Sequence, residues 1–145
     1  MTFEDRHRDY LISTDPARLD LDVIHRWLAE ESYWAQGRTR ETVETSVANS
    51  LNFGAYNAAG VMVGGARVVT DYATFAWLCD VFVVAAHRGQ GLGKALVAAV
   101  CHHPGLRQIK RFALATADAH DLYRQYGFEI LDKPERWMVK RGSTA

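Results

Sequence analysis

The residues best suited to chemistry form a glycine-rich segment in the second half of the chain, Arg88-Gly89-Gln90-Gly91-Leu92-Gly93-Lys94. Glycine at every second position lets the backbone approach a ligand closely and leaves consecutive amide N–H groups free to point outward. A mostly apolar stretch precedes the segment and a helix-forming stretch follows it, so the positive end of a helix dipole adds to these donors. The pattern predicts a pyrophosphate site, with Arg88 and Lys94 available for further contact.

Two other phosphate-binding loops do not fit this segment. A P-loop requires four residues between its first glycine and a Gly-Lys pair that is followed by Ser or Thr. With Gly93-Lys94 as that pair, the glycine would stand at position 88 and the Ser or Thr at position 95, but these residues are Arg88 and Ala95. A dinucleotide-binding loop that begins at Gly89 requires glycine at position 94, which is Lys94. The segment therefore belongs to a third kind of anion loop.

A second motif follows in the expected order, Leu122-Tyr123-Arg124-Gln125-Tyr126-Gly127-Phe128. Together with Arg-x-x-Gly-x-Gly at residues 88–93, it resembles the two signatures of the GNAT superfamily of N-acetyltransferases. The resemblance covers residues 9–141, nearly the whole chain. It implies an acetyl-CoA-dependent N-acetyltransferase that uses no metal and transfers the acetyl group to an amine by direct attack in a ternary complex.

The resemblance also implies which residues contact acetyl-CoA. A backbone amide at the end of the strand before the loop, at Val83 or its neighbour, would meet the thioester oxygen. Many members carry Asn seven residues before the motif tyrosine, and here that position is Thr116, which offers only part of the amide's hydrogen bonding. The expected coenzyme contacts are Phe82, Val83, Arg88, Gly89, Gln90, Gly91, Leu92, Gly93, Lys94, Thr116 and Tyr123.

Two catalytic roles need side chains. Tyr123 corresponds to the family's usual general acid, which protonates the departing sulfur, although it also lies on the apolar stripe of a helix and could simply pack. An ammonium group must lose a proton before attack, and Asp80 and Glu31 are the two candidates for the base. Either carboxylate could equally be a solvated or capping charge.

We expect aromatic residues to form the acceptor pocket, because aromatic faces suit a cationic amine. The connection after the first helix and the last hairpin would supply them. The expected acceptor-binding residues are Tyr33, Trp34, Trp77, Asp80 and Trp137. The expected acceptor is an amine of a small molecule or a peptide.

The pattern of hydrophobic residues predicts a single α+β domain over residues 1–145, with a mixed sheet of about seven strands flanked by about four helices. Consecutive strands predict an antiparallel meander, and a strand-helix-strand unit follows the glycine loop. The expected strands span residues 9–14, 52–56, 61–70, 74–84, 111–116, 128–131 and 136–140, and the expected helices span 20–32, 39–50, 91–102 and 118–126.

Composition and charge argue against several other classes of protein. Lys plus Arg and Asp plus Glu both number 17, so no global charge draws the protein to nucleic acid or to an anionic membrane. The first ten residues do not resemble a secretory signal, and no apolar run reaches a membrane span, so we expect a cytoplasmic protein. Cys79 and Cys101 lack metal-type spacing. A homodimer is compatible with the resemblance, and the alternative to an enzyme is a non-catalytic acyl-CoA-binding sensor or interaction module.

Overall fold

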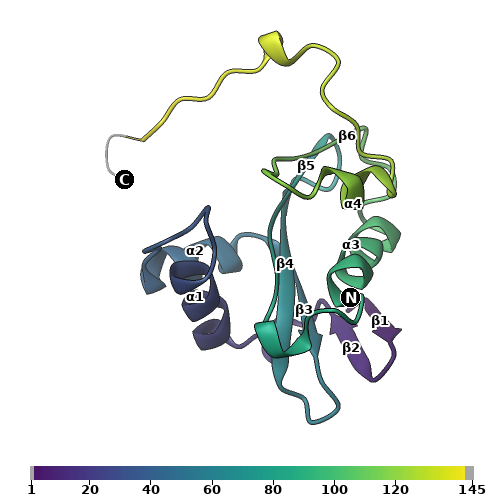
Figure 1. Cartoon of the computed structure of the whole chain (residues 1–145). Coiled ribbons are helices and arrows are strands. Elements are labelled where there is room, and N and C mark those ends of the chain that lie inside the picture. Colours follow the sequence, from purple (N-terminus) through teal and green to yellow (C-terminus); the bar gives the residue numbers. More distant parts are fainter. Residues whose placement is uncertain (1, 143–145) are drawn as a thin grey trace.

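The computed structural model describes residues 2–142 and contains one six-stranded sheet with four α-helices. Figure 1 shows the sheet between two layers of helices, with α1 and α2 on one face and α3 on the other. In chain order the elements are β1 (Glu4–His7), β2 (Tyr10–Ser13), α1 (Leu21–Glu30), α2 (Arg40–Ala48), β3 (Leu51–Tyr56), β4 (Met62–Thr70), β5 (Phe75–Val83), α3 (Leu92–His102), β6 (Arg111–Leu114) and α4 (His120–Arg124).

The strands lie in the sheet in their sequence order, β1 to β6. The first five are antiparallel neighbours, and β6 pairs with β5 in parallel after the α3 crossover. This is the mixed sheet of an α+β domain, and it confirms the predicted fold class.

Side-chain caps fix the start of α1 and α2, and apolar faces pack the helices against the sheet. The side chains of Asp20 and Thr39 accept hydrogen bonds from backbone N–H groups in the first turns of α1 and α2. One core lies between α3 and the sheet. A second core lies between the α1–α2 pair and the sheet, and the residues buried in it are Ile24, Leu28, Ala35, Val43, Tyr56, Met62 and Phe82.

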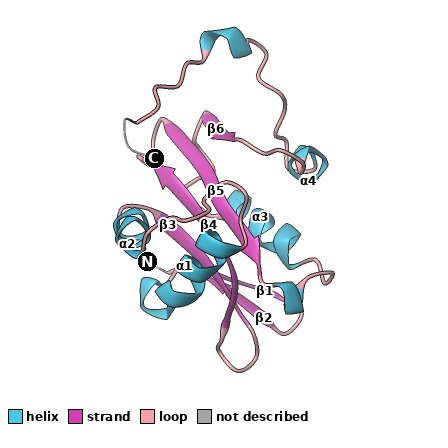
Figure 2. Ribbon diagram, turned by 60° about the vertical axis from the view of Figure 1, so that its left-hand side comes forward, coloured by secondary structure: helices cyan, strands magenta, loops and turns pink. Residues whose placement is uncertain are grey.

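The parallel pair β5–β6 is short, and the two strands then part. Pairing runs from Phe75 with Arg111 to Leu78 with Leu114, while β5 continues for five residues to Val83 without a partner on that side. The stretch from Cys79 to Val83 therefore keeps one open edge next to the glycine loop (Figure 2).

A β-bulge interrupts β5 at the same place. Gly65 pairs with Phe82 and Arg67 pairs with Cys79, so two residues of β5 lie opposite one residue of β4. Asp80 is the first of the two and has a positive φ of 52°, which is unusual for a residue with a side chain. The bulge shifts the alternation of side chains by one position in the second half of the strand.

Two expectations about strands were wrong. The structure has six strands in residues 2–142, because neither 128–131 nor 136–140 forms the predicted hairpin. These residues run outward in an extended path, broken by a 3-10 turn at Pro134–Arg136. An additional strand, β1, precedes the predicted first strand, and its mixed charges gave no apolar alternation to find. Within the described part of the chain, no helix is both long and apolar enough to cross a membrane.

Candidate active site

The glycine loop places unpaired backbone donors at the start of α3. Gly89 and Gly91 have φ values of 78° and 77°, in the left-handed region that glycine adopts without strain. The backbone N–H groups of residues 89–94 donate to no acceptor within residues 2–142, and the helical bonds begin only with Ala95 N–H to Gly91 O. This row of N–H groups, aligned with the helix dipole, is suited to bind a pyrophosphate.

The loop is fixed in place by the first hairpin, which sequence reasoning did not connect with it. His7 Nε2 lies 2.7 Å from the backbone oxygen of Gln90. The hydroxyl of Tyr10 lies 2.8 Å from His87 Nδ1 and 3.3 Å from Oε1 of Gln90. The Gln90 side chain is thereby held by Tyr10, so its expected contribution to coenzyme binding is limited to its backbone N–H.

The open edge of β5 presents one further backbone donor beside the loop. Val84 N–H donates to Val63 O in β4, so the N–H of Val83 must point to the opposite edge, since successive residues of a strand alternate. That edge is the one that β6 leaves uncovered after Leu114. Phe82 points its side chain into the core with α1, which leaves only its backbone for a coenzyme.

Tyr123 and Thr116 both lie in the segment after β6, Tyr123 within α4. Tyr123 is half-buried against the core, and its ring lies 5.9 Å from that of Phe128. Burial, with smaller contributions from Tyr33 and Asp118, raises the pKa of Tyr123 above its ordinary value, so the phenol stays protonated at neutral pH. The Thr116 hydroxyl accepts a hydrogen bond from Ala119 N–H at 3.0 Å and thereby shapes the turn into α4.

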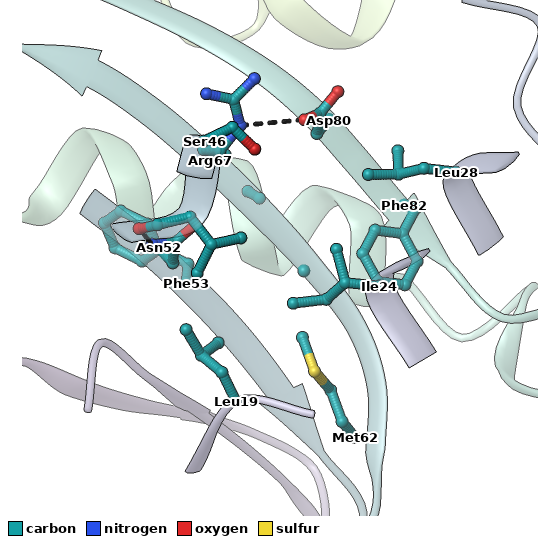
Figure 3. A pocket seen from close by; sticks show the side chains of 13 residues that line it. Leu19, Ile24, Leu28, Ser46, Asn52, Phe53, Met62, Arg67, Asp80 and Phe82 are labelled. Atoms are coloured by element: carbon teal, nitrogen blue, oxygen red, sulfur yellow. Dashed lines mark hydrogen bonds and ion pairs between the residues drawn. The ribbon is translucent and has the colours of Figure 1, made fainter. Parts of the chain in front are cut away.

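Asp80 lies at the centre of a polar network on the face of the sheet that α1 and α2 cover. Its Oδ2 accepts hydrogen bonds from Arg67 Nε and from Arg38 Nη1, both at 2.9 Å, and its Oδ1 accepts one from Trp34 Nε1 at 2.8 Å. Arg67 also donates to the Ser50 hydroxyl at 3.0 Å. Figure 3 shows Arg67 and Asp80 reaching toward each other from neighbouring strands.

The same contacts set the protonation state of Asp80. Burial alone would raise the pKa of this carboxyl group, but Arg67, the Trp34 indole and Arg38 outweigh burial and hold the pKa below its ordinary value. A carboxylate of lowered pKa that already accepts three hydrogen bonds is a poor proton acceptor. This arrangement argues against Asp80 as the general base and favours a role in holding Trp34 and Arg38 in place.

Aromatic side chains surround this network. Trp27 stacks on Phe82 with ring centroids 5.0 Å apart, Trp34 lies 5.6 Å from Trp27, and Tyr33 meets Trp34 edge-on at 5.1 Å. The Tyr33 hydroxyl accepts a hydrogen bond from Ala117 N–H at 3.0 Å, which ties the connection after α1 to the segment after β6. The two predicted aromatic residues of this connection are thus brought together. Trp27 was missed, because its helical spacing marked it only as a core residue.

A small, mostly apolar cavity lies under this cluster, between α1, α2 and the sheet. The space open to the centre of a water molecule is about 20 Å³, which is room for a single water. Figure 3 shows its lining, which includes Arg67, Asp80 and Phe82.

The other predicted site residues occupy separate positions. Glu31 is exposed and caps the end of α1, directly before the Tyr33–Trp34 connection. Trp77 is half-buried in the paired part of β5, opposite Ala113. Trp137 packs near Phe75, at the opposite end of β5 from Val83, about 25 Å away along a strand of this length. Trp137 therefore does not line the gap of its own chain.

The remaining predicted coenzyme contacts belong to the loop itself. Arg88 and Lys94 are exposed, and Arg88 Nε donates to Val83 O at 3.2 Å, while Leu92 is the buried first residue of α3. In the described residues, no group of three His, Cys, Asp or Glu side chains could hold a metal ion.

A row of unpaired backbone N–H groups at the start of a helix, beside two parallel strands that part, is the arrangement expected of a coenzyme A-dependent acyltransferase. The sequence model of the acetyltransferase (GNAT) domain family matches residues 48–130. An acetyltransferase-family protein of Gibberella zeae, FG08082, is 30% identical over 134 residues, covering 79% of this chain and 76% of its own. The chain belongs to the GNAT family of acetyltransferases.

Solved structures agree with this assignment. The crystal structure of a GNAT-family protein from Xanthomonas campestris pv. campestris superposes with a TM-score of 0.89 at 44% identity, covering 94% of each chain. A Clostridium acetobutylicum protein, crystallised with acetyl-CoA, shares the fold at a TM-score of 0.66 and 14% identity, covering 97% of this chain and 96% of its own.

Proposed function

We propose that this protein transfers an acetyl group from acetyl-CoA to a primary amine of a small molecule or peptide, by direct attack in a ternary complex. The observation that carries the proposal is the row of unpaired N–H groups of residues 89–94 beside the open edge of β5. Family membership supports the donor, and the structure of the Clostridium acetobutylicum relative holds the same coenzyme.

The donor would be held almost entirely by backbone. The N–H groups of residues 89–94 would bind the pyrophosphate, and Arg88 and Lys94 are exposed and able to add charge contacts. The Val83 N–H would donate to the thioester oxygen, where negative charge develops during attack, an effect typically worth about 3–4 kcal/mol. Thr116 is the side chain nearest in sequence to the end of β6 that could meet the pantetheine arm.

Two different residues would carry out the two proton transfers, one to the departing sulfur and one from the acceptor ammonium. The Tyr123 phenol, kept protonated by burial, would protonate the departing sulfur. Glu31 would take the proton of the acceptor ammonium, directly or through water, because it is exposed at the entrance of the aromatic connection. Asp80 would instead hold the acceptor wall, through Trp34 and Arg38.

Direct attack is favoured over a covalent acetyl-cysteine step. Cys79 and Cys101 are free thiols, and burial raises the pKa of Cys79 to about 11 and that of Cys101 above its ordinary value. Both sulfurs are therefore protonated at neutral pH, and a thiol is a much weaker nucleophile than a thiolate.

Calorimetry with CoA and acetyl-CoA tests the donor site. Gly93→Asp places a negative charge in the first turn of α3, which suits the helix dipole but repels a pyrophosphate, so affinity should fall at least about tenfold without loss of stability. Gly93→Ala is the matched control, since a Cβ there meets only Val83 Cγ2 at 3.9 Å. Equal affinity of the two variants would contradict the loop assignment.

A thiol-release assay against amino acids, polyamines, aminoglycosides and lysine peptides tests catalysis. Release with one class of amine would identify the acceptor. Coenzyme binding without release for any amine would instead favour the non-catalytic acyl-CoA sensor.

A further inference from the structure

The guanidinium group of Arg38 lies in the candidate acceptor site and is only partly used by the protein. Its Nη1 donates to Asp80 Oδ2 at 2.9 Å, and this is the one side-chain hydrogen bond that Arg38 makes within residues 2–142. A guanidinium group carries five N–H donors and keeps its charge at neutral pH. Most of the donors of Arg38 are therefore available to a ligand.

Positive charge and hydrogen-bond donors are in excess around Arg38. Arg67 Nε reaches the same Asp80 Oδ2 at 2.9 Å, so two guanidinium groups share one carboxylate. The indole N–H of Trp27, whose ring lies 5.6 Å from that of Trp34, is buried and has no acceptor within residues 2–142. A ligand that fits this site supplies negative charge and acceptor atoms.

The three charged groups differ in their exposure to solvent. The side chain of Asp80 is 6% exposed, whereas that of Arg67 is 16% exposed and that of Arg38 is 21% exposed. A molecule that enters from solvent therefore meets the guanidinium of Arg38 before it meets the carboxylate. This order favours an anionic group of the ligand over a cationic one.

Arg38 is also held in place before any ligand arrives. Its backbone N–H donates to Ala35 O at 3.0 Å, and His25 Nε2 lies 3.0 Å from its carbonyl oxygen. Gly37, with φ of 74°, makes the turn that precedes it. Because Asp80 fixes the side chain as well, little conformational entropy is lost when a ligand binds.

Arg38 belongs to the segment that crosses toward the open edge of β5. The Tyr33 hydroxyl accepts a hydrogen bond from Ala117 N–H at 3.0 Å, so the connection between α1 and α2 reaches the segment after β6. Asp80 precedes Val83 by three residues, which is at most about 10 Å along a strand. One small molecule can therefore extend from Arg38 to the gap beside Val83.

We infer that the acceptor is an amine that also carries a carboxylate, and that Arg38 binds this carboxylate through the N–H groups that Asp80 leaves unused. The inference rests on the proposed function and names the substrate class of the same site. Guanidinium and carboxylate groups match in shape and charge, so such a pair selects for a planar anion. Polyamines and aminoglycosides, which bring only positive charge, would be repelled.

Matched acceptors test the inference with the wild-type protein. The panel contains the common α-amino acids and β-alanine, each as the free acid and as its carboxamide, and thiol release from acetyl-CoA is measured for each pair. The amide keeps the amine and removes the negative charge. For the acids that serve as acceptors, kcat/KM should exceed that of the amide at least about tenfold, as expected for one hydrogen bond between charged groups. Equal values for acid and amide would overturn the inference.

Arg38→Gln tests the assignment to this residue. The KM for the acids should rise at least about tenfold with kcat little changed, and the values for the amides should stay as in the wild type, so the preference disappears. Acid and amide are compared within one variant, so a general loss of folded protein affects both equally. Arg26→Gln, at an exposed arginine of α1, is the matched control and should keep the preference. A preference that survives in Arg38→Gln would overturn the role of Arg38.

Binding of the N-acetylated forms of the same panel separates this inference from the proposed function, because it needs no turnover. Calorimetry with and without CoA should show that the acids bind to the wild type at least about tenfold more tightly than the amides, and that Arg38→Gln binds both alike. This preference without thiol release for any amine would reject the proposed enzyme and retain the carboxylate site. Equal affinities of the acid and amide forms for the wild type would overturn the inference even in a protein that acetylates amines.

Discussion

The indole Nε1 of Trp34 donates a 2.8 Å hydrogen bond to Oδ1 of Asp80, a residue 46 positions away in sequence. The bond joins the connection after α1 to the bulge of β5 and so fixes one wall of the candidate acceptor site. Two arginines hold the other carboxylate oxygen. Asp80 therefore connects the aromatic wall to the sheet.

Replacing Asp80 by Asn should destabilise the fold. The variant leaves Arg67 and Arg38 without their counter-charge in a mostly buried setting, and breaking such a pair from one side costs about 3–5 kcal/mol. Urea unfolding measures the loss. Asp121→Asn is the control, because its carboxylate pairs with Arg124 on the surface, and such a pair contributes about 0–1 kcal/mol.

The effect of Asp80 should depend on pH in a defined direction. Its pKa is lower in the folded protein than in the unfolded chain, so its contribution to stability is complete above the unfolded value of about 3.9 and is lost as pH falls through the folded value. The difference in unfolding free energy between wild type and Asp80→Asn should hence be constant near neutrality and shrink below about pH 4. A difference that grew on acidification would contradict the ion-pair account.

Tyr123→Phe should lower kcat while leaving coenzyme affinity unchanged. A positioned general acid typically contributes about 100-fold or more, and the variant removes only the hydroxyl group. Because the pKa of Tyr123 is raised, the wild-type enzyme should not lose activity through this group until the pH exceeds about 10. Tyr72→Phe, at the exposed β4–β5 turn, is the control. Unchanged kcat in Tyr123→Phe would leave Tyr123 a packing residue.

Much of the fold followed from the sequence because most elements carry their own local signals. The alternation of apolar residues in β3 to β5 depends on neighbouring residues alone. The glycine loop was also found, since its left-handed positions need glycine wherever they occur.

The bulge at Asp80 could not be predicted in this way. Simple alternation places Asp80 on the same face as Leu78, toward α3, whereas the bulge turns it toward α1 and α2. Nothing local marks a non-glycine residue at positive φ. One signal was available, because a carboxylate in an apolar strand needs a buried partner, and Arg67 on the preceding strand was a candidate.

The failed hairpin has a different cause. Residues 128–131 and 136–140 have strand-forming sequences, but a strand exists only where a neighbour supplies hydrogen bonds, and that neighbour is not determined by the segment itself. Within residues 2–142 neither stretch has such a neighbour, so neither forms a strand.

Glu31→Gln should lower kcat/KM by about 100-fold at neutral pH if Glu31 accepts the proton of the ammonium acceptor. The deficit should shrink as pH rises toward about 10.4, because more of the amine is then already neutral. Glu30→Gln is the matched control, one residue earlier and also exposed on α1. A deficit that is equal in both variants, or independent of pH, would assign the loss to something other than proton transfer.

Tyr10→Phe tests whether the first hairpin supports coenzyme binding through the glycine loop. The variant removes the hydroxyl that meets His87 Nδ1 at 2.8 Å and Gln90 Oε1 at 3.3 Å, and it keeps the ring that packs in the core. Loss of about 1 kcal/mol of loop ordering should raise the Kd for CoA about fivefold, with kcat at saturating coenzyme nearly unchanged. Calorimetry measures the first quantity and thiol release the second. An unaltered Kd would mean that the loop keeps its shape without the hairpin, so that the backbone donors of residues 89–94 would be organised by α3 alone.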